Sequence, residues 1–451
     1  MTRRLLVGLL ATLLVTRPAW AHGEDAAADA APGDAAAPSP GWQLTWDHAH
    51  LQARQALPSQ ALSGYLLQGD AGTELRGTRL VHAAVGVTVQ AVDGWLLHGE
   101  LAQHGGDAPH AEALWARRGL HGAVTGAESG TGTASLTTIT IGRQAPAQGP
   151  LWTTAGHHDR FVLMPLAKQA TTLGTWLDDG VQLQWAPSSE TPWGPAQHRL
   201  HIGLWQGHAF PGSRSTSGTP SLHGGTALDH ASGLWTLDAW AAVARVSERG
   251  ARLNLGGRGH SHVAPQCSTQ PGNAPLSNVV CFSGRSTLSG WSLGWRGPEG
   301  LQPVGWPELF NAARWRLDVG QLWRQEGGQL ASTNGQVDLH SRYAGQLLQA
   351  WWTGDAVEVG WRGERLMARH RVVGAGAAAV AQDAGLVGYA PVHRHTLALA
   401  WPLPTAWLGG GRAGAFSTDV RVAIESGQER QGDQRVHFAT VRLVIGAGGL
   451  W

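Results

Sequence analysis

The chain has 451 residues, of which only 14% are charged, and 33 basic residues against 32 acidic ones give a net charge of +1. Typical globular domains carry roughly 25% charged residues, and a balanced charge gives no electrostatic reason to bind nucleic acid. Beyond residue 21 no run of eighteen apolar residues occurs, so no membrane-spanning helix is predicted. Low charge without long apolar runs is typical of a membrane β-barrel, whose lipid-facing and lumen-facing residues alternate.

The first part of the chain has the composition of an export signal. Arg3 and Arg4 precede an apolar run from Leu5 to Val15, and Ala19-Trp20-Ala21 is a small-x-small cleavage site. We therefore expect residues 1–21 to be a signal peptide and the protein to be exported in a Gram-negative bacterium.

Residues 22–41 are rich in Ala, Pro and Asp and contain too few apolar residues for a core, so we expect a disordered periplasmic tail. From Trp42 onward apolar and polar residues alternate with period two, which predicts strands. We expect residues 42–451 to form an all-β, transmembrane antiparallel β-barrel in the outer membrane.

Sixteen alternating segments predict sixteen strands, an even number as in bacterial barrels. Tryptophan often ends the apolar face of a segment, as aromatic girdles at the membrane interfaces require. The chain has 23 tryptophans, which we expect on the lipid face. The predicted strands are 42–54, 75–91, 94–104, 110–118, 135–144, 180–186, 198–207, 234–246, 250–262, 284–297, 310–325, 335–352, 355–371, 388–402, 412–426 and 435–451.

The predicted connections alternate between two ends of the barrel. Short connections at 92–94, 247–250 and 353–355 would all lie on the periplasmic side. The long connection at about 145–179 and the segment that holds the two cysteines would lie on the outer side.

The connection at about 145–179 is too long for a hairpin, and its run from Phe161 to Leu166 is too apolar for a solvent loop. We expect it to fold inward, pack on the wall and constrict the pore. The charged and histidine side chains that it would bring to the constriction are His157, His158, Asp159, Arg160, Lys168, Asp178 and Asp179.

Arginines share the lumen-facing parity of the predicted strands, and a ring of arginines can attract anions in a pore. The expected pore-wall residues are Arg199, Arg252, Arg296, Arg314, Arg316, Arg362, Arg421 and Arg442, with Arg258 and Arg394 at the same parity. The alternative is that these arginines pair with lumen Asp and Glu side chains and only solvate the wall.

Histidine is the second chemical signal, with 22 in the chain. The pair His157-His158 with Asp159, and the pair His260 and His262 on one strand face, suit Zn or Cu. The alternative is polar filling of a lumen, because no single segment supplies three ligands at fixed spacing. No resident metal or other cofactor is assigned.

Cys267 and Cys281 are the only two cysteines. Export places them in an oxidising compartment, so a local disulfide in an external loop is expected. Metal ligation by the two thiolates is the weaker alternative.

Two motifs suggest a family. The run ITIGRQAPAQG at 139–149, followed by DDGVQLQW at 178–185, resembles the phosphate-selective porin family of Gram-negative outer membranes. The resemblance implies a sixteen-stranded trimeric porin with a constriction loop. That family is associated with lysine-rich lumen clusters, whereas this chain has one lysine, Lys168.

The expected function is a water-filled outer-membrane channel for small hydrophilic solutes or ions, with a possible preference for anions. The alternative is a metal-linked receptor or uptake channel for zinc or copper that uses lumen histidines. No Gly-x-Ser-x-Gly or His-Glu-x-x-His motif occurs, so no enzymatic activity is expected. Expected partners are outer-membrane lipid and lipopolysaccharide, the outer-membrane assembly machinery, two further copies in a homotrimer, and small solutes or anions, but no nucleic acid.

Overall fold

The computed structural model divides the chain into two units, Met1–Ala37 and Pro38–Trp451. The residues that it describes all belong to the second unit and are 40–61, 77–105, 109–120, 135–154, 160–172, 176–207, 218–252, 279–298, 314–354, 356–386, 390–403 and 416–450. The predicted signal peptide and nearly all of the predicted tail lie outside these residues, so both stay predictions.

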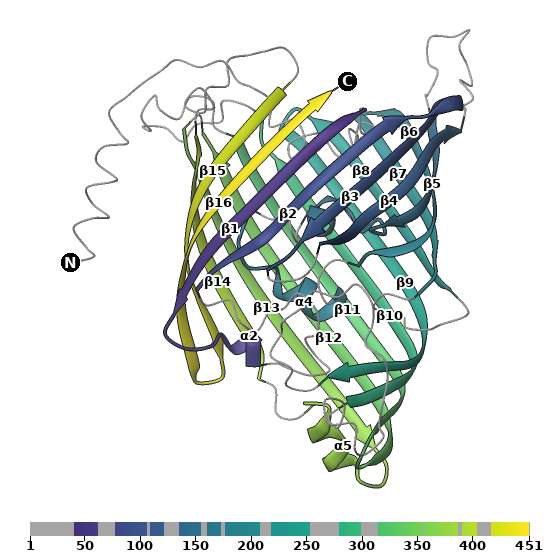
Figure 1. Ribbon diagram of the computed structural model, residues 1–451, viewed down its shortest axis with the longest axis vertical. Coiled ribbons are helices and arrows are strands. Elements are labelled where there is room, and N and C mark those ends of the chain that lie inside the picture. The colour runs from purple at the N-terminus through teal and green to yellow at the C-terminus, as the bar shows by residue number, and fades with distance from the viewer. Residues whose placement is uncertain are drawn as a thin grey trace, which may run out of the picture. The chain divides into compact units, whose positions relative to one another are not determined.

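Sixteen antiparallel strands, each hydrogen-bonded to its sequence neighbours, form a closed barrel in which β1 pairs with β16 (Figure 1). The predicted fold class is confirmed. The strands are β1 (Gly41–Ala53), β2 (Gly77–Gln90), β3 (Trp95–Gln103), β4 (His110–Leu120), β5 (Ser135–Gln144), β6 (Asp178–Thr191), β7 (Gly194–Trp205), β8 (Thr219–His230), β9 (Gly233–Arg252), β10 (Val279–Arg296), β11 (Arg314–Ser332), β12 (Gly335–Thr353), β13 (Glu358–Val373), β14 (Val392–Leu403), β15 (Phe416–Gln431) and β16 (Gln434–Leu450).

Side chains of opposite character occupy the two faces of the wall. Leu114 and Leu397 are 64% and 58% exposed on the outer face, whereas Asp238 and Glu425 are 1% and 0% exposed on the lumen face. An apolar outer face around a polar interior is the arrangement that a lipid bilayer requires of a barrel. The chain is therefore a β-barrel of the bacterial outer membrane.

The closing seam between β1 and β16 is reinforced by a buried ion pair. Asp47 on β1 accepts two hydrogen bonds from Arg442 on β16, at 2.9 and 2.5 Å. Both side chains are nearly inaccessible to solvent, so the pair forms in a region of low dielectric, where leaving either charge alone would be costly.

Tryptophan is divided between the two faces of the wall. Trp185 and Trp235 are exposed on the outer face, as predicted. Trp205, Trp240 and Trp351 are instead buried on the lumen face among apolar side chains. The expectation of tryptophan on the lipid face is thus correct for only part of the set, because the lumen of this barrel also contains an apolar filling.

The count of sixteen strands is correct, but two of the predicted strands are not. The predicted turn at 247–250 is a β-bulge inside the single strand β9, where Glu248 has a φ of 52° and the register with β10 shifts. Residues 250–252 therefore continue β9, and the rest of the predicted strand 250–262 lies outside the described residues. Strand β8 has no counterpart among the predicted strands, because its sequence TPSLHGGTALDH alternates weakly.

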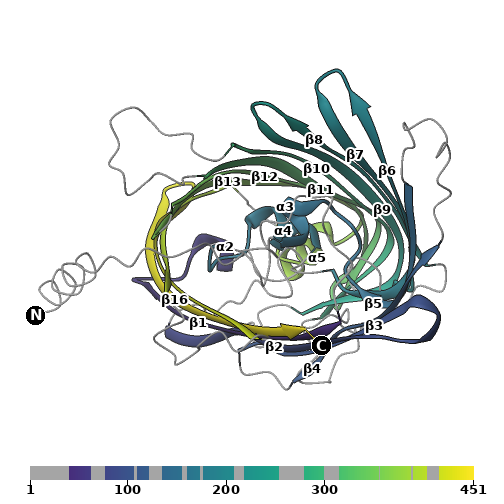
Figure 2. The ribbon, with the colours of Figure 1, turned by 90° about the horizontal axis from the view of Figure 1, so that it is seen from above.

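The described helices are short. They are α2 (Pro58–Ala61), the 3₁₀ helix η1 (Val92–Gly94), α3 (Pro150–Thr154), α4 (Leu166–Thr172) and α5 (Ala377–Asp383). Among the described residues no helix has the length and the apolar character needed to cross a membrane. Seen along the barrel, α3 and α4 lie inside the ring of strands (Figure 2).

Candidate functional site

The connection between β5 and β6 enters the barrel. Its described residues are 145–154, 160–172 and 176–177. Helix α3 packs against β10, and α4 packs against β11, β12 and β13. We call residues 160–172 the inner segment, and the lumen face of β10–β15 on which it lies the covered wall.

Apolar contacts hold α4 to the covered wall. Leu166 and Ala170 are buried in one cluster with Leu330, Tyr343 and Leu366 of β11, β12 and β13. Burial of aliphatic side chains of this size stabilises such a contact by roughly 1.5–3 kcal/mol each. A predominantly apolar patch of lumen wall therefore exists because a segment of the same chain covers it.

A glycine permits the close approach of α4. A Cβ atom built on Gly345 of β12 would lie 2.4 Å from the Cα atom of Ala167. Real Cβ atoms do not come this close to a backbone atom, so only glycine at 345 allows the helix to touch the strand.

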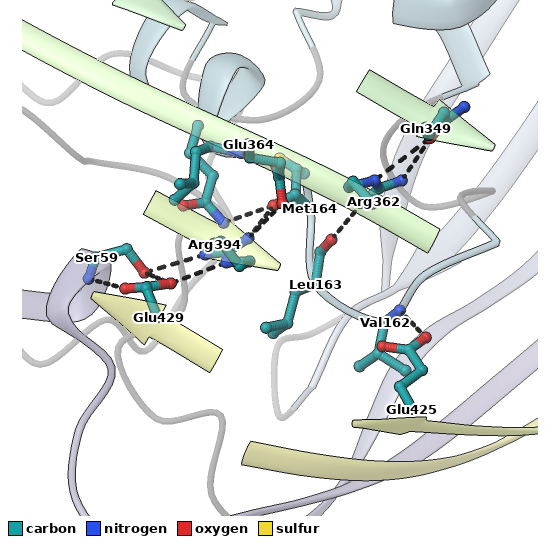
Figure 3. Close-up of polar contacts among 12 residues, drawn as sticks. Ser59, Val162, Leu163, Met164, Gln349, Arg362, Glu364, Arg394, Glu425 and Glu429 are labelled. Atoms are coloured by element: carbon teal, nitrogen blue, oxygen red, sulfur yellow. Dashed lines mark hydrogen bonds and ion pairs between the residues drawn. The ribbon is translucent and has the colours of Figure 1, made fainter. Parts of the chain in front are cut away.

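Two arginines of the covered wall bind carbonyl groups of the inner segment (Figure 3). Arg362 of β13 donates from Nη1 to the Leu163 carbonyl oxygen at 3.0 Å. Arg394 of β14 donates from Nη1 to the Met164 carbonyl oxygen at 2.9 Å. The segment is not helical at these residues, so the arginines accept the role that a helix or a strand ladder would otherwise have.

Two carboxylates bind the amide groups of the same segment. The Val162 amide donates to Glu425 of β15, and the Leu166 amide donates to Glu364 of β13, both at 2.7 Å. All four protein partners are charged side chains, and hydrogen bonds of this kind are shorter and stronger than neutral ones. We call Arg362, Glu364, Arg394 and Glu425 the clamp.

The clamp extends to a second segment of the chain. Arg394 donates to Glu429 at 2.8 Å and to the Ser59 hydroxyl at 3.1 Å. Ser59 lies in α2, and both its amide and its hydroxyl also donate to Glu429. The same arginine therefore fixes the inner segment and α2 against the wall.

The aromatic ring of Phe161 lies between cationic and aromatic neighbours. The Arg362 guanidinium lies 4.0 Å from its centroid, and the Trp351 ring lies 4.8 Å away. Arg160 in turn lies over Trp351 and 3.8 Å from Glu358. The contact of Phe161 with the wall agrees with the expectation for this apolar run.

The other residues expected at the constriction have different environments. Lys168 is buried in α4. Asp178 accepts a hydrogen bond from the Gly207 amide at 2.9 Å, and Asp179 forms an ion pair with Arg143 at 2.9 Å. These two aspartates begin β6 and do not face the arginines of the covered wall, contrary to expectation. His157, His158 and Asp159 lie outside the described residues.

Most of the expected pore-wall arginines are paired with carboxylates, as in the alternative above. Arg199 bonds to Asp238 and Arg316 to Asp318, at 3.1 and 2.8 Å. Arg421 bonds to Glu358, and Arg442 to Asp47. Arg252, Arg296 and Arg314 are terminal residues of β9, β10 and β11. Arg258 and the pair His260 and His262 lie outside the described residues.

The opposite side of the lumen has another composition. We call the lumen face of β2–β7 the polar wall. The described helices make their main contacts elsewhere, with β10–β13 and, for α2, with β15 and β16. Side chains of the polar wall bond to each other, and its half-buried members include His98, Trp115, Arg117, Gln184 and His201.

Cys281 is buried on β10, and the part of the chain that the structure describes contains no free cysteine. Its expected partner, Cys267, lies outside the described residues. The disulfide between the two therefore stays a prediction.

The clamp carboxylates Glu364, Glu425 and Glu429 were not among the expected site residues. Glu364 and Arg362 share the lumen-facing parity of one strand, and that signal was sufficient to place them in the lumen. Their partners could not be found in the same way, since they are backbone groups of a segment about 200 residues away in sequence.

No protein-family model and no curated protein match the chain. Among solved structures it is similar to a loop-deletion mutant of OmpT, an outer membrane protein of Vibrio cholerae, with 10% identity, a TM-score of 0.44 and coverage of 91% of this chain and 98% of that one. It is also similar to OprB of Pseudomonas putida (10% identity, TM-score 0.42, 91% and 93% covered) and to an anion-selective porin from Comamonas acidovorans (10%, 0.39, 90% and 98%). At TM-scores this low the likenesses carry no weight for function, and the fold assignment depends on the strand ladders themselves.

The expectation that the chain has no enzymatic activity does not stand. It was drawn from missing sequence motifs, whereas the first structures in the comparison are forms of OmpT, described only as an outer membrane protein. A barrel of this kind does not by itself separate a channel from an enzyme, so missing motifs exclude nothing.

Proposed function

We propose that this protein is a porin-like channel through which small hydrophilic solutes cross the outer membrane. The observation that carries the proposal is the clamp, which holds the inner segment inside a sixteen-stranded barrel by four charge-assisted hydrogen bonds. A segment fixed in this way narrows the lumen without closing it, because it lies on one side only.

The solute path runs along the polar wall. There the side chains available to a solute are hydrogen-bonding groups, such as His98, Gln184 and His201, which replace part of the solute's hydration. The covered wall offers no such surface, since its polar groups already bind the inner segment.

Arg117 gives the path a weak preference for anions. Its side chain is half-buried on the polar wall, lies over the Trp115 ring and donates to the Thr140 hydroxyl at 3.1 Å. No carboxylate lies within ion-pair distance of it among the described residues, in contrast to most of the other lumen arginines. This preference, and not selectivity for phosphate, is the finer part of the proposal.

Single-channel recording in planar bilayers tests the proposal. Purified full-length protein should give steady conductance steps proportional to voltage. A folded barrel that inserts into the bilayer and conducts no ions would contradict it.

The barrel also carries a basic surface on its outer face, which we propose binds phosphorylated lipid. We call it the basic belt, and its members face away from the lumen on β10, β12 and β13, at the end of the barrel where β11 turns into β12. They are Arg285, His340, Arg342, Arg365, Arg369 and Arg371.

Like charges are placed side by side in the basic belt. Arg342 is the direct cross-strand partner of Arg369, and His340 is that of Arg371. Such pairs destabilise a sheet unless an anion lies between them. The belt residues other than Arg365 line a groove of ≈ 850 Å³ on this face.

The position of the belt favours lipopolysaccharide over a free anion. On β12 the exposed Leu348 belongs to the apolar band, and Arg342 lies nearer the turn, beyond the edge of that band. Phosphates of a lipid headgroup reach this depth while the acyl chains cover the band. The predicted outer side of the long β5–β6 connection is the same end of the barrel.

Binding of purified lipid A to the detergent-solubilised protein tests this partner. The double variant Arg342→Gln, Arg369→Gln should bind at least about tenfold more weakly, since each charged hydrogen bond contributes roughly 1.5–3 kcal/mol. Arg118→Gln on β4 is the control and should bind normally. Equal affinity for dephosphorylated lipid A, or an unchanged double variant, would contradict the assignment.

The homotrimer stays a proposal that depends on the family resemblance, and native mass spectrometry of the detergent-solubilised protein would test it. The metal-linked alternative depended on histidines outside the described residues.

A further inference from the structure

A cluster of two histidines and a glutamate lies on the lumen side of three neighbouring strands. His82 is on β2, Glu112 is on β4, and His104 directly follows β3. Their exposed fractions are 0%, 5% and 6%. Titratable side chains buried to this extent need partners, and here they contact each other.

The geometry of the cluster suits a metal ion. Both histidine Nε2 atoms lie 3.1 Å from a carboxylate oxygen of Glu112, one on each oxygen. One ligand atom from each residue lies within 4.8 Å of the others. A tetrahedral zinc ion with bonds of about 2.0–2.1 Å separates its ligand atoms by roughly 3.3 Å, so small shifts of the side chains would admit the ion.

A β-bulge aims Glu112 at the histidines. Glu100 pairs with Ala113 and Leu101 with Ala111, which leaves Glu112 as the extra residue of β4. Leu114, two positions on, is exposed on the lipid face, so in a regular strand Glu112 would face lipid as well. The bulge turns its carboxylate into the lumen, and bulges commonly have this role near functional sites.

A second bulge lies beside His82. Asp47 of β1 pairs with His82, but His48 pairs with Leu80, so Val81 is the extra residue of β2. Two of the three strands that supply the cluster are therefore interrupted where they supply it. Irregularities of this kind cost ladder hydrogen bonds, and a bound ligand would explain why they occur together.

Further donor groups surround the cluster. Glu100 hydrogen-bonds to Glu112, and the His110 ring lies 5.3 Å from the His104 ring. Two carboxyl groups in contact repel each other unless a proton or a cation lies between them. The surroundings are thus richer in carboxylate than two neutral histidines require.

Another histidine pair in the lumen lacks these properties. His201 and His223 have ring centroids 5.0 Å apart, but Asp238, which bonds to His223, also bonds to Arg199. A guanidinium already neutralises that carboxylate, so nothing there attracts a metal ion.

We propose that His82, His104 and Glu112 bind one divalent transition-metal ion, with zinc as the best match. Two imidazoles and a carboxylate are typical zinc ligands, whereas calcium and magnesium prefer oxygen ligands alone. Three protein ligands leave a fourth position for water or for a solute in the lumen. The inference does not depend on the proposed channel function, because it concerns side chains of β2–β4 and not the inner segment.

Equilibrium dialysis of Zn²⁺ against the folded full-length protein tests the site. The wild type should bind one high-affinity zinc ion per chain. Glu112→Gln, which keeps the size of the side chain, should weaken that binding by at least about tenfold, since loss of even an outer-shell partner has this effect. His223→Gln is the matched control from the other histidine pair and should bind as the wild type does.

The spectrum of the Co²⁺-substituted wild type gives a second readout that needs no variant. Intense visible absorption of low-coordinate Co²⁺, displaced by one equivalent of Zn²⁺, is expected. If Glu112→Gln folds and binds zinc as tightly as the wild type, the proposal is wrong. If that variant does not fold, absence of the displaceable Co²⁺ absorption in the wild type overturns the proposal equally.

Discussion

The covered wall and the polar wall face each other across one lumen and differ in what their charged side chains do. On the covered wall, Arg362 and Arg394 bind carbonyl groups of the inner segment. On the polar wall, Arg117 contacts only an aromatic ring and a hydroxyl group. The same residue type therefore fixes a loop in one place and is available to a solute in the other.

The difference shows why counting lumen arginines does not give the field of a pore. A buried arginine with two carboxylate partners, such as Arg394 with Glu364 and Glu429, adds no positive charge to the lumen. Only a small number of charges remain for the solute, and they lie on the wall that the loop leaves open.

The largest expected effect comes from releasing the clamp. In the double variant Arg362→Gln, Arg394→Gln, the carbonyl groups of the inner segment lose both cationic donors, and Glu364, Glu425 and Glu429 repel each other. Removal of one partner from a buried charge network typically costs about 3–5 kcal/mol. Single-channel conductance should rise severalfold in a barrel that still migrates as folded in unheated gels.

The matched control for this variant is Arg143→Gln. Arg143 and Asp179 form an ion pair whose side chains are 36% and 37% exposed. A half-exposed pair contributes about 0–1 kcal/mol, so conductance and stability should stay near wild type. A conductance equal to wild type in the clamp variant would mean that the inner segment does not limit the current.

A smaller effect is expected from Gly345→Val. The new side chain would overlap the backbone of Ala167 and push α4 away from the covered wall. Conductance should increase and become noisier, because the segment loses its apolar contact but keeps the clamp. Gly99→Ala on the polar wall is the control, since a Cβ atom there meets only Leu114 at 3.8 Å. Wild-type currents in Gly345→Val would show that α4 need not touch β12.

Arg117→Gln should change selectivity more than conductance. With the arginine removed, the path along the polar wall loses a charge without a carboxylate partner among the described residues. Reversal potentials in a salt gradient should shift towards cations by a modest amount, and more at low salt than at high salt because screening is weaker. An identical shift in Arg442→Gln, whose arginine is paired with Asp47 at the seam, would contradict the contrast between paired and available arginines.

The smallest effect is expected from the cysteines. Cys267 and Cys281 should form a disulfide that closes a short loop between β9 and β10, outside the strand ladders. Reduction should leave conductance and barrel folding almost unchanged. Alkylation of both thiols in unfolded, unreduced protein would show that the bond does not form.

The barrel could be predicted from the sequence because a lipid-facing wall imposes alternation on nearly every strand. The strand 135–144 was predicted with its observed bounds. The errors occur where local sequence contradicts the ladder: β8 contains two adjacent glycines and a proline, and the bulge at Glu248 has the composition of a turn. The ladder with neighbouring strands decides both cases, and the segment alone does not contain that information.

The site was less predictable than the fold. Parity placed Arg362 and Arg394 in the lumen correctly, but it could not show that they bind the Leu163 and Met164 carbonyl groups. Such pairings depend on the register of strands that are far apart in sequence. Glu112 is the clearest case, since its parity with Leu114 predicts the lipid face and only the bulge turns it inward.

Thiol labelling of single cysteines during conductance recording tests the division of the lumen most directly. Gln184→Cys lies on the polar wall, and Thr396→Cys lies on the buried lumen face of β14, within the covered wall. A positively charged methanethiosulfonate reagent should reduce the current of open Gln184→Cys channels rapidly and leave Thr396→Cys and wild-type channels unchanged. Rapid block at Thr396→Cys with no effect at Gln184→Cys would place the solute path on the opposite wall and contradict the account.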